Sequence, residues 1–131
     1  MNTKIIAALL FLLFILLVIL AADTGTMPAF IRAVYNFPGG DKAGHFSLYG
    51  ILAFLLARAF PRQLQVGTLS IPIVTLILLI FATLEELSQS FFSTRSFDLL
   101  DLTCSFLGIL AGTWLRHWQR AERNKSKVRR T

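Results

Sequence analysis

The chain has 131 residues, of which 55% are hydrophobic and 15% charged, and this composition excludes a soluble domain of that length. The length allows one domain rather than two. The formal net charge is +6, but the positive charge is concentrated in residues 116–131, directly after an apolar run, which favours an anchor on anionic lipid headgroups over a nucleic-acid surface.

The first apolar run, Ile5–Ala22, contains no charged residue and no helix breaker. Its length of about 18 residues is just enough to cross the hydrocarbon core of a bilayer as a helix. The alternative is a secretory signal peptide, with Lys4 as its basic start and cleavage after Ala22. The run is longer than a usual signal-peptide core and has the bulky Leu20 at the −3 position, so the sequence favours an uncleaved span.

The segment from Asp23 to Gly40 contains glycine and proline but also several apolar side chains. These apolar residues predict a short amphipathic helix lying in the membrane interface. They are Phe30, Ile31, Val34, Tyr35 and Phe37. The stretch Pro38-Gly39-Gly40 then predicts a turn, because glycine adopts backbone angles that other residues resist.

Three further runs are predicted to be membrane-spanning helices. The second covers about Ala43–Phe60 and ends at a proline, and a short polar connection over residues 62–68 follows it. The third begins near Leu69, with Pro72 in its first turn, and continues past two glutamates towards Phe92. The fourth covers about Asp98–Trp118 and contains the chain's one cysteine, so no internal disulfide is expected.

Basic residues near span ends mark the cytoplasmic side of a membrane. Threading the four runs through a bilayer puts ten of the thirteen basic residues on one side and six of the seven acidic residues on the other. The basic side carries Lys4, Arg58, Arg62, Arg116, Arg120, Arg123, Lys125, Lys127, Arg129 and Arg130; the acidic side carries Asp23, Asp41, Glu85, Glu86, Asp98 and Asp101, with Arg32, Lys42 and Arg95. The predicted fold is therefore all-α: a four-helix transmembrane bundle over residues 1–115 with both termini cytoplasmic, followed by a basic cytoplasmic tail over residues 116–131.

Three polar clusters are predicted to lie at the outer ends of the helices. The first consists of Asp41, Lys42, His45 and Tyr49, and the second of Glu86 and Gln89 beside Glu85. The third contains Arg95, Asp98, Asp101, Ser105, Gly108 and Gly112. Asp101, Ser105 and the two glycines follow the spacing of one helical stripe. The pair Gly108 and Gly112 lets another helix approach closely, which would draw this stripe into the bundle.

Four explanations of these clusters remain open. Ionisable groups at membrane depth are costly unless they are paired or hydrated, so the simplest explanation is structural ion pairing by Lys42 and Arg95. The second is a binding site for a lipid headgroup or another amphiphile. The third is a catalytic site with His45 or Glu86 as general base. A metal site is the least favoured, because one histidine with scattered carboxylates is a weak ligand set; no metal and no cofactor are expected.

In this order, the clusters resemble the VanZ-like family of bacterial integral membrane proteins. The family pattern has Asp-Lys-x-x-His on one helix, Glu-x-x-Gln on the next, and Arg, Asp, Asn, Gly and Gly through the last. The matching residues, within 41–115, are Asp41, Lys42, His45, Glu86, Gln89, Arg95, Asp101, Gly108 and Gly112. Ser105 departs from the pattern, since the family usually carries asparagine there. The family's namesake is associated with resistance to the lipoglycopeptide teicoplanin.

This resemblance implies a multi-pass protein of the bacterial cytoplasmic membrane. We expect its outward-facing site to recognise a lipid-linked envelope component or a lipid-tailed, glycopeptide-type antibiotic, without catalysis. The ligand-binding residues would be Asp41, Lys42, His45, Tyr49, Glu86, Gln89, Arg95, Asp101 and Ser105. The alternatives are a small membrane enzyme acting on a lipid headgroup, and a scaffold that docks to a larger membrane complex through Gly108 and Gly112. Expected partners are membrane lipids and an amphiphilic small molecule, with an oligomer or membrane-protein partner also allowed.

Overall fold

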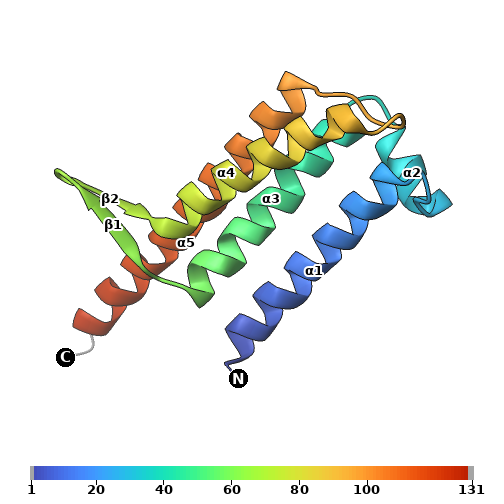
Figure 1. Ribbon diagram of the computed structural model, residues 1–131. Helices are drawn as coiled ribbons and strands as arrows, with labels where there is room; N and C mark the ends of the chain where they lie inside the picture. The colour runs from blue at the N-terminus through green and yellow to red at the C-terminus, as the bar shows by residue number, and fades with distance from the viewer. Residues whose placement is uncertain (1, 130–131) are drawn as a thin grey trace.

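The computed structural model describes residues 2–129, and within them the chain is mostly helical (Figure 1). The helices and strands are α1 (Thr3–Asp23), α2 (Ala29–Tyr35), α3 (Gly40–Ala59), β1 (Gln63–Val66), β2 (Leu69–Pro72), α4 (Ile73–Ser88), the 3₁₀ helix η1 (Gln89–Phe91) and α5 (Leu99–Val128). The start of α1 and the end of α5 lie at the same end of the molecule, and α2 lies at the other (Figure 1).

Three of the described helical segments are long and apolar enough to cross a membrane: Thr3–Asp23, Ile73–Phe91 and Leu99–Val128. These correspond to the first, third and fourth predicted spans. The second, α3, is not among them, because its first two turns carry Asp41, Lys42 and His45. The prediction of four apolar membrane-spanning helices is therefore confirmed for three. Large apolar side chains such as Leu10, Leu13 and Leu17 of α1 point outwards, as lipid contact requires.

The all-α prediction is wrong between α3 and α4, where β1 and β2 form an antiparallel hairpin. Residues 67 and 68 form its turn, and Gly67 has a φ of +60°, which glycine adopts without strain. The apolar run predicts a span from Leu69, but the helix begins at Ile73. Pro72 has an extended ψ of 127° and precedes the first turn instead of lying within it.

Five α-helices are present in the described residues rather than four. The additional one, α2, is the short helix predicted in the segment after α1. The extension of the third run is also confirmed, because η1 continues α4 as far as Phe91. Helix α5 continues past the predicted end at Trp118 to Val128, so the basic segment is helical over most of its length. The last two residues of the predicted tail, Arg130 and Thr131, lie outside the described residues.

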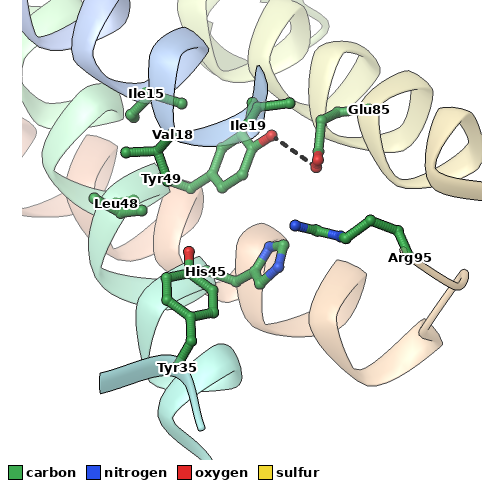
Figure 2. Close-up of a pocket in the computed structure, with 9 residues that line it drawn as sticks. All are labelled: Ile15, Val18, Ile19, Tyr35, His45, Leu48, Tyr49, Glu85 and Arg95. Atoms are coloured by element: carbon green, nitrogen blue, oxygen red, sulfur yellow. Dashed lines mark hydrogen bonds between the residues drawn. The ribbon is translucent and has the colours of Figure 1, made fainter. Parts of the chain in front are cut away.

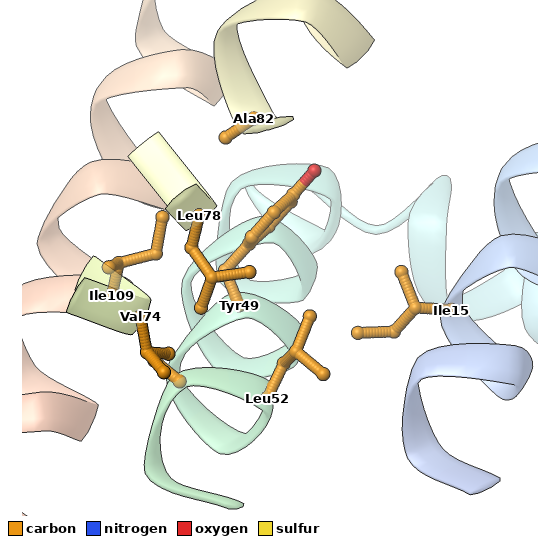
Figure 3. Packing of buried hydrophobic residues seen from close by; sticks show 8 residues of the cluster. Ile15, Tyr49, Leu52, Val74, Leu78, Ala82 and Ile109 are labelled. Carbon is orange, nitrogen blue, oxygen red and sulfur yellow. The ribbon is translucent and has the colours of Figure 1, made fainter. Parts of the chain in front are cut away.

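A small apolar core joins the four long helices (Figure 3). It contains Ile15 of α1, Leu52 of α3, Leu78 of α4 and Ile109 of α5. The backbones of helices α3 and α5 are in contact where they carry glycine. A Cβ atom added at Gly108 would overlap the carbonyl oxygen of Phe46, and one at Gly112 would overlap that of Gly50. The predicted close approach at these glycines is therefore made within the chain, and it aligns the polar stripe of α5 with that of α3.

Candidate functional site

Lys42 stands at the centre of an acidic cluster at the end of the bundle near α2. Its Nζ lies 3.1 Å from Asp41 Oδ2, 3.2 Å from Asp98 Oδ2 and 3.1 Å from Asp101 Oδ1. Asp98 is also the N-cap of α5, where its Oδ1 accepts a hydrogen bond from the Leu100 N–H at 2.8 Å. That hydrogen bond and the Lys42 ammonium hold the pKa of the Asp98 carboxyl below its usual range. This cluster ties the start of α3 to the start of α5.

One turn deeper, the His45 side chain is 7% exposed and lies between two residues of α5. Its Nδ1 is 3.0 Å from Ser105 Oγ, and its Nε2 is 3.7 Å from Asp101 Oδ2. The ring stacks on Tyr49, with the ring centroids 6.4 Å apart. Tyr49 in turn donates a hydrogen bond to Glu85 Oε2 at 3.4 Å. The stripe of α3 therefore connects the carboxylates of α4 with the polar residues of α5.

Glu85 and Glu86 share one hydrogen-bond donor at the end of α4. Gln89 Nε2 donates to Glu85 Oε1 at 2.8 Å and to Glu86 Oε2 at 3.2 Å. Glu86 Oε1 accepts from the Asp98 N–H at 2.8 Å, which fixes the loop that enters α5. Gln89 Oε1 accepts from Arg95 Nε at 3.2 Å. Glu85, Glu86 and Gln89 are all buried, so this is an interior network.

The structure brings the three predicted clusters together at one end of the bundle. All nine residues predicted to bind a ligand belong to this network: Asp41, Lys42, His45, Tyr49, Glu86, Gln89, Arg95, Asp101 and Ser105. The sequence places Glu85 and Asp98 in the polar clusters, but neither they nor Tyr35 are among the predicted ligand-binding residues. Glu85 lies four residues before Gln89 and Asp98 three before Asp101, spacings that put each pair on one helix face.

A cavity of about 20 Å³ lies between α1 and this network. Figure 2 shows the Arg95 guanidinium pointing towards His45 and the Glu85 carboxylate, with Tyr35 on the other side of the imidazole. The volume accommodates one water molecule or ion. Burial raises the pKa of the Tyr35 hydroxyl, so this group stays neutral and can donate a hydrogen bond at physiological pH.

An apolar groove of about 830 Å³ runs between α1, α2 and α3 on the outer side of this cavity. Its walls include Phe14, Phe30 and Ala43. Val18, Tyr35 and Leu48 line both the groove and the small cavity, so the groove adjoins the cavity that His45, Glu85 and Arg95 also line.

Two groups of the described side chains have the donor atoms and spacing to hold a metal ion. In the first, donor atoms of His45, Glu85 and Glu86 all lie within 4.8 Å of one another. In the second, Asp41, Asp98 and Asp101 do the same, but the Lys42 ammonium contacts all three and neutralises part of their charge. The carboxylates that appeared scattered in the sequence are thus gathered around the histidine by the fold.

Ser105, His45 and Asp101 contain the residue types of a hydrolytic triad, so catalysis needs a structural test. A nucleophile must reach its substrate, and Ser105 is only 1% exposed. Its Oγ faces His45 from inside the contact between α3 and α5. Ser105 therefore orients the imidazole, and the geometry does not support nucleophilic catalysis by this serine.

Comparison of the chain with protein-family models, curated proteins and solved structures gives no match. The resemblance to the VanZ-like family therefore stays a prediction, carried by the polar residues and their spacing.

Proposed function

We propose that this chain is a VanZ-like membrane protein that recognises an amphiphile at the outer surface of a bacterial cytoplasmic membrane. The observation that carries the proposal is the wall, formed by Val18, Tyr35 and Leu48, that the apolar groove shares with the small cavity lined by His45 and Arg95. A molecule with an apolar tail and a polar headgroup has the same two-part chemistry. Its tail would lie in the groove, and its headgroup would reach Arg95 past Tyr35.

Arg95 is the cation best placed for the headgroup. The hydrogen bond that the described residues give its side chain runs from Nε to Gln89, which leaves the two terminal nitrogens as donors. Guanidinium groups bind phosphate and carboxylate through two parallel hydrogen bonds. Lys42 already contacts three carboxylates, so its role in this proposal is to align α3 and α5 rather than to hold the ligand.

The proposal requires the site to face outwards, with both termini in the cytoplasm and with α3 as a fourth span. In the described residues, the end of the bundle opposite the site carries Lys4, Arg58 and the basic part of α5. The polar start of α3 is tolerable within a bundle because Lys42 and His45 have partners on α5. This charge asymmetry supports the orientation through the positive-inside rule.

Topology can be tested with a reporter enzyme that is active only outside the cytoplasm. Fusion at the C-terminus should give no activity, and insertion after Thr26, between α1 and α2, should give full activity. The reverse pattern would place the polar site in the cytoplasm and contradict the proposal. Activity at both positions would place the C-terminus outside the cytoplasm, which means an odd number of spans and contradicts the predicted four.

Amphiphile recognition can be tested with Ala43→Trp, which fills the groove, and Arg95→Gln, which removes the guanidinium. Ile51→Trp is the matched control, since Ile51 is exposed on α3 but does not line the groove. The probes are an acylated lipoglycopeptide, its deacylated form and a polyprenyl phosphate, titrated into the full chain in nanodiscs. We expect A43W and R95Q to bind at least one of the two lipid-tailed probes at least tenfold more weakly than the wild type does, and I51W to bind it with wild-type affinity.

Equal affinity of the wild type and all variants for every probe would contradict the proposal. Tighter binding of the deacylated lipoglycopeptide than of the acylated one would also contradict it. Binding of the lipoglycopeptide but not the polyprenyl phosphate would identify an antibiotic, and the reverse would identify an envelope intermediate. The scaffold alternative has less support, because Gly108 and Gly112 are already covered by α3.

A further inference from the structure

His45, Glu85 and Glu86 bring three donor groups from two helices into one buried space. Their side chains are 7%, 8% and 1% exposed. Donor atoms of all three lie within 4.8 Å of one another, close enough for a single ion to contact each of them. We propose that these three residues bind one divalent transition-metal ion. This inference does not depend on amphiphile recognition.

The charge balance of the network favours a cation there. Five carboxylates meet at this end of the bundle, against Lys42 and Arg95. Lys42 contacts the three aspartates, and no described lysine or arginine lies within ion-pair distance of Glu85 or Glu86. Their partners are neutral donors, such as Tyr49 and Gln89. Two adjacent buried carboxylates without a paired cation are unfavourable, and a bound divalent ion would compensate both charges.

The imidazole can supply the third donor. In the tautomer whose Nδ1–H donates to Ser105, His45 Nε2 carries the lone pair that a metal ion needs. Nε2 lies 3.7 Å from Asp101 Oδ2, too far for a hydrogen bond. A bound cation would select this tautomer over the one that points Nε2–H at Asp101. Metal-binding histidines commonly donate their other ring N–H to a fixed hydrogen-bond acceptor, and Ser105 Oγ is positioned to be that acceptor.

The donor set limits the choice of ion. One imidazole nitrogen and two carboxylate oxygens suit Zn²⁺, Mn²⁺ or Fe²⁺ better than the all-oxygen sites of Mg²⁺ and Ca²⁺. Three protein donors leave a coordination position for water, and the cavity of about 20 Å³ beside His45 and Glu85 has room for it. Arg95 also faces this space, so its positive charge should weaken metal binding.

The experiment uses the full chain in detergent or nanodiscs after treatment with a chelator. Zn²⁺ and Mn²⁺ are titrated separately by calorimetry, and bound metal is counted after desalting. We expect one ion per chain for the wild type with at least one of the two metals. His117→Gln, at the chain's other histidine, should bind as the wild type does, because His117 lies on the exposed basic part of α5.

His45→Gln and Glu86→Gln should each weaken binding at least tenfold. Glu86→Gln keeps an oxygen to accept the Asp98 N–H, and circular dichroism and size-exclusion chromatography check that both variants fold. Ser105→Ala should weaken binding about tenfold by releasing the imidazole. Arg95→Gln should bind the metal at least as tightly as the wild type, although it loses amphiphile binding. The proposal is overturned if the wild type binds neither ion, or if folded H45Q and E86Q bind as tightly as H117Q.

Discussion

Replacing Gly112 by leucine should lower the stability of the folded chain by roughly 3 kcal/mol, the upper range for overpacking a well-packed contact. The reason is backbone contact: even a Cβ atom at this position would overlap the carbonyl oxygen of Gly50. Because neither helix backbone can move aside locally, α3 and α5 would have to separate. The site would then lose its geometry, since His45 and Ser105 lie on the same two helices.

The measurement is unfolding in detergent followed by circular dichroism, with Ala111→Leu as the control. Ala111 is the preceding residue of α5 and is exposed, so leucine there should change the stability little. Equal stability of the two variants would show that the glycine contact does not hold the helices together. A stable G112L that has become a dimer would show that the face prefers a second chain.

The helices were predictable because their signals are local. Long apolar runs predicted α1, α3, α4 and α5, and the apolar residues of the segment after α1 predicted α2. The hairpin was missed because its second strand, Leu69–Pro72, is apolar and merges with the next run. Only the positions of Pro72 and Gly67 distinguish a strand and turn from the start of a helix. The apolar run predicts the end of α5 at Trp118, but the helix continues to Val128 because lysine and arginine are good helix formers.

The candidate site was predictable as a set of residues but not as a set of contacts. Helical spacing correctly aligned Asp101, Ser105 and the glycines on one face of α5. It could not show that Lys42 would contact three carboxylates, because that depends on how α3 and α5 pack. From the sequence, the metal site is the least favoured explanation for a related reason. His45 and Glu86 are 41 positions apart in the sequence, and only the fold brings them within 4.8 Å.

Replacing Glu86 by alanine should be the most damaging change within the polar network. Glu86 is 1% exposed, and its two oxygens accept from the Asp98 N–H and from Gln89 Nε2. Alanine leaves both donors unpaired and opens a cavity, which together should lower stability by about 3 kcal/mol in metal-free samples. Glutamine keeps the shape and one acceptor and removes the repulsion from Glu85, so E86Q should stay within about 1 kcal/mol of the wild type.

The matched control is Glu122→Ala, the same substitution in an exposed pair with Lys125, which should change stability by about 0.5 kcal/mol or less. Chemical unfolding of the wild type and the three variants in chelator-treated detergent compares them directly. If E86A is as stable as E122A, the hydrogen bond to Asp98 does not fix the entry into α5. If E86Q is as unstable as E86A, the negative charge of Glu86 itself holds the network together. The expected order, with E86Q close to the wild type and E86A far below it, separates the two roles of Glu86: its shape and acceptor position the start of α5, and its charge is free to bind an ion.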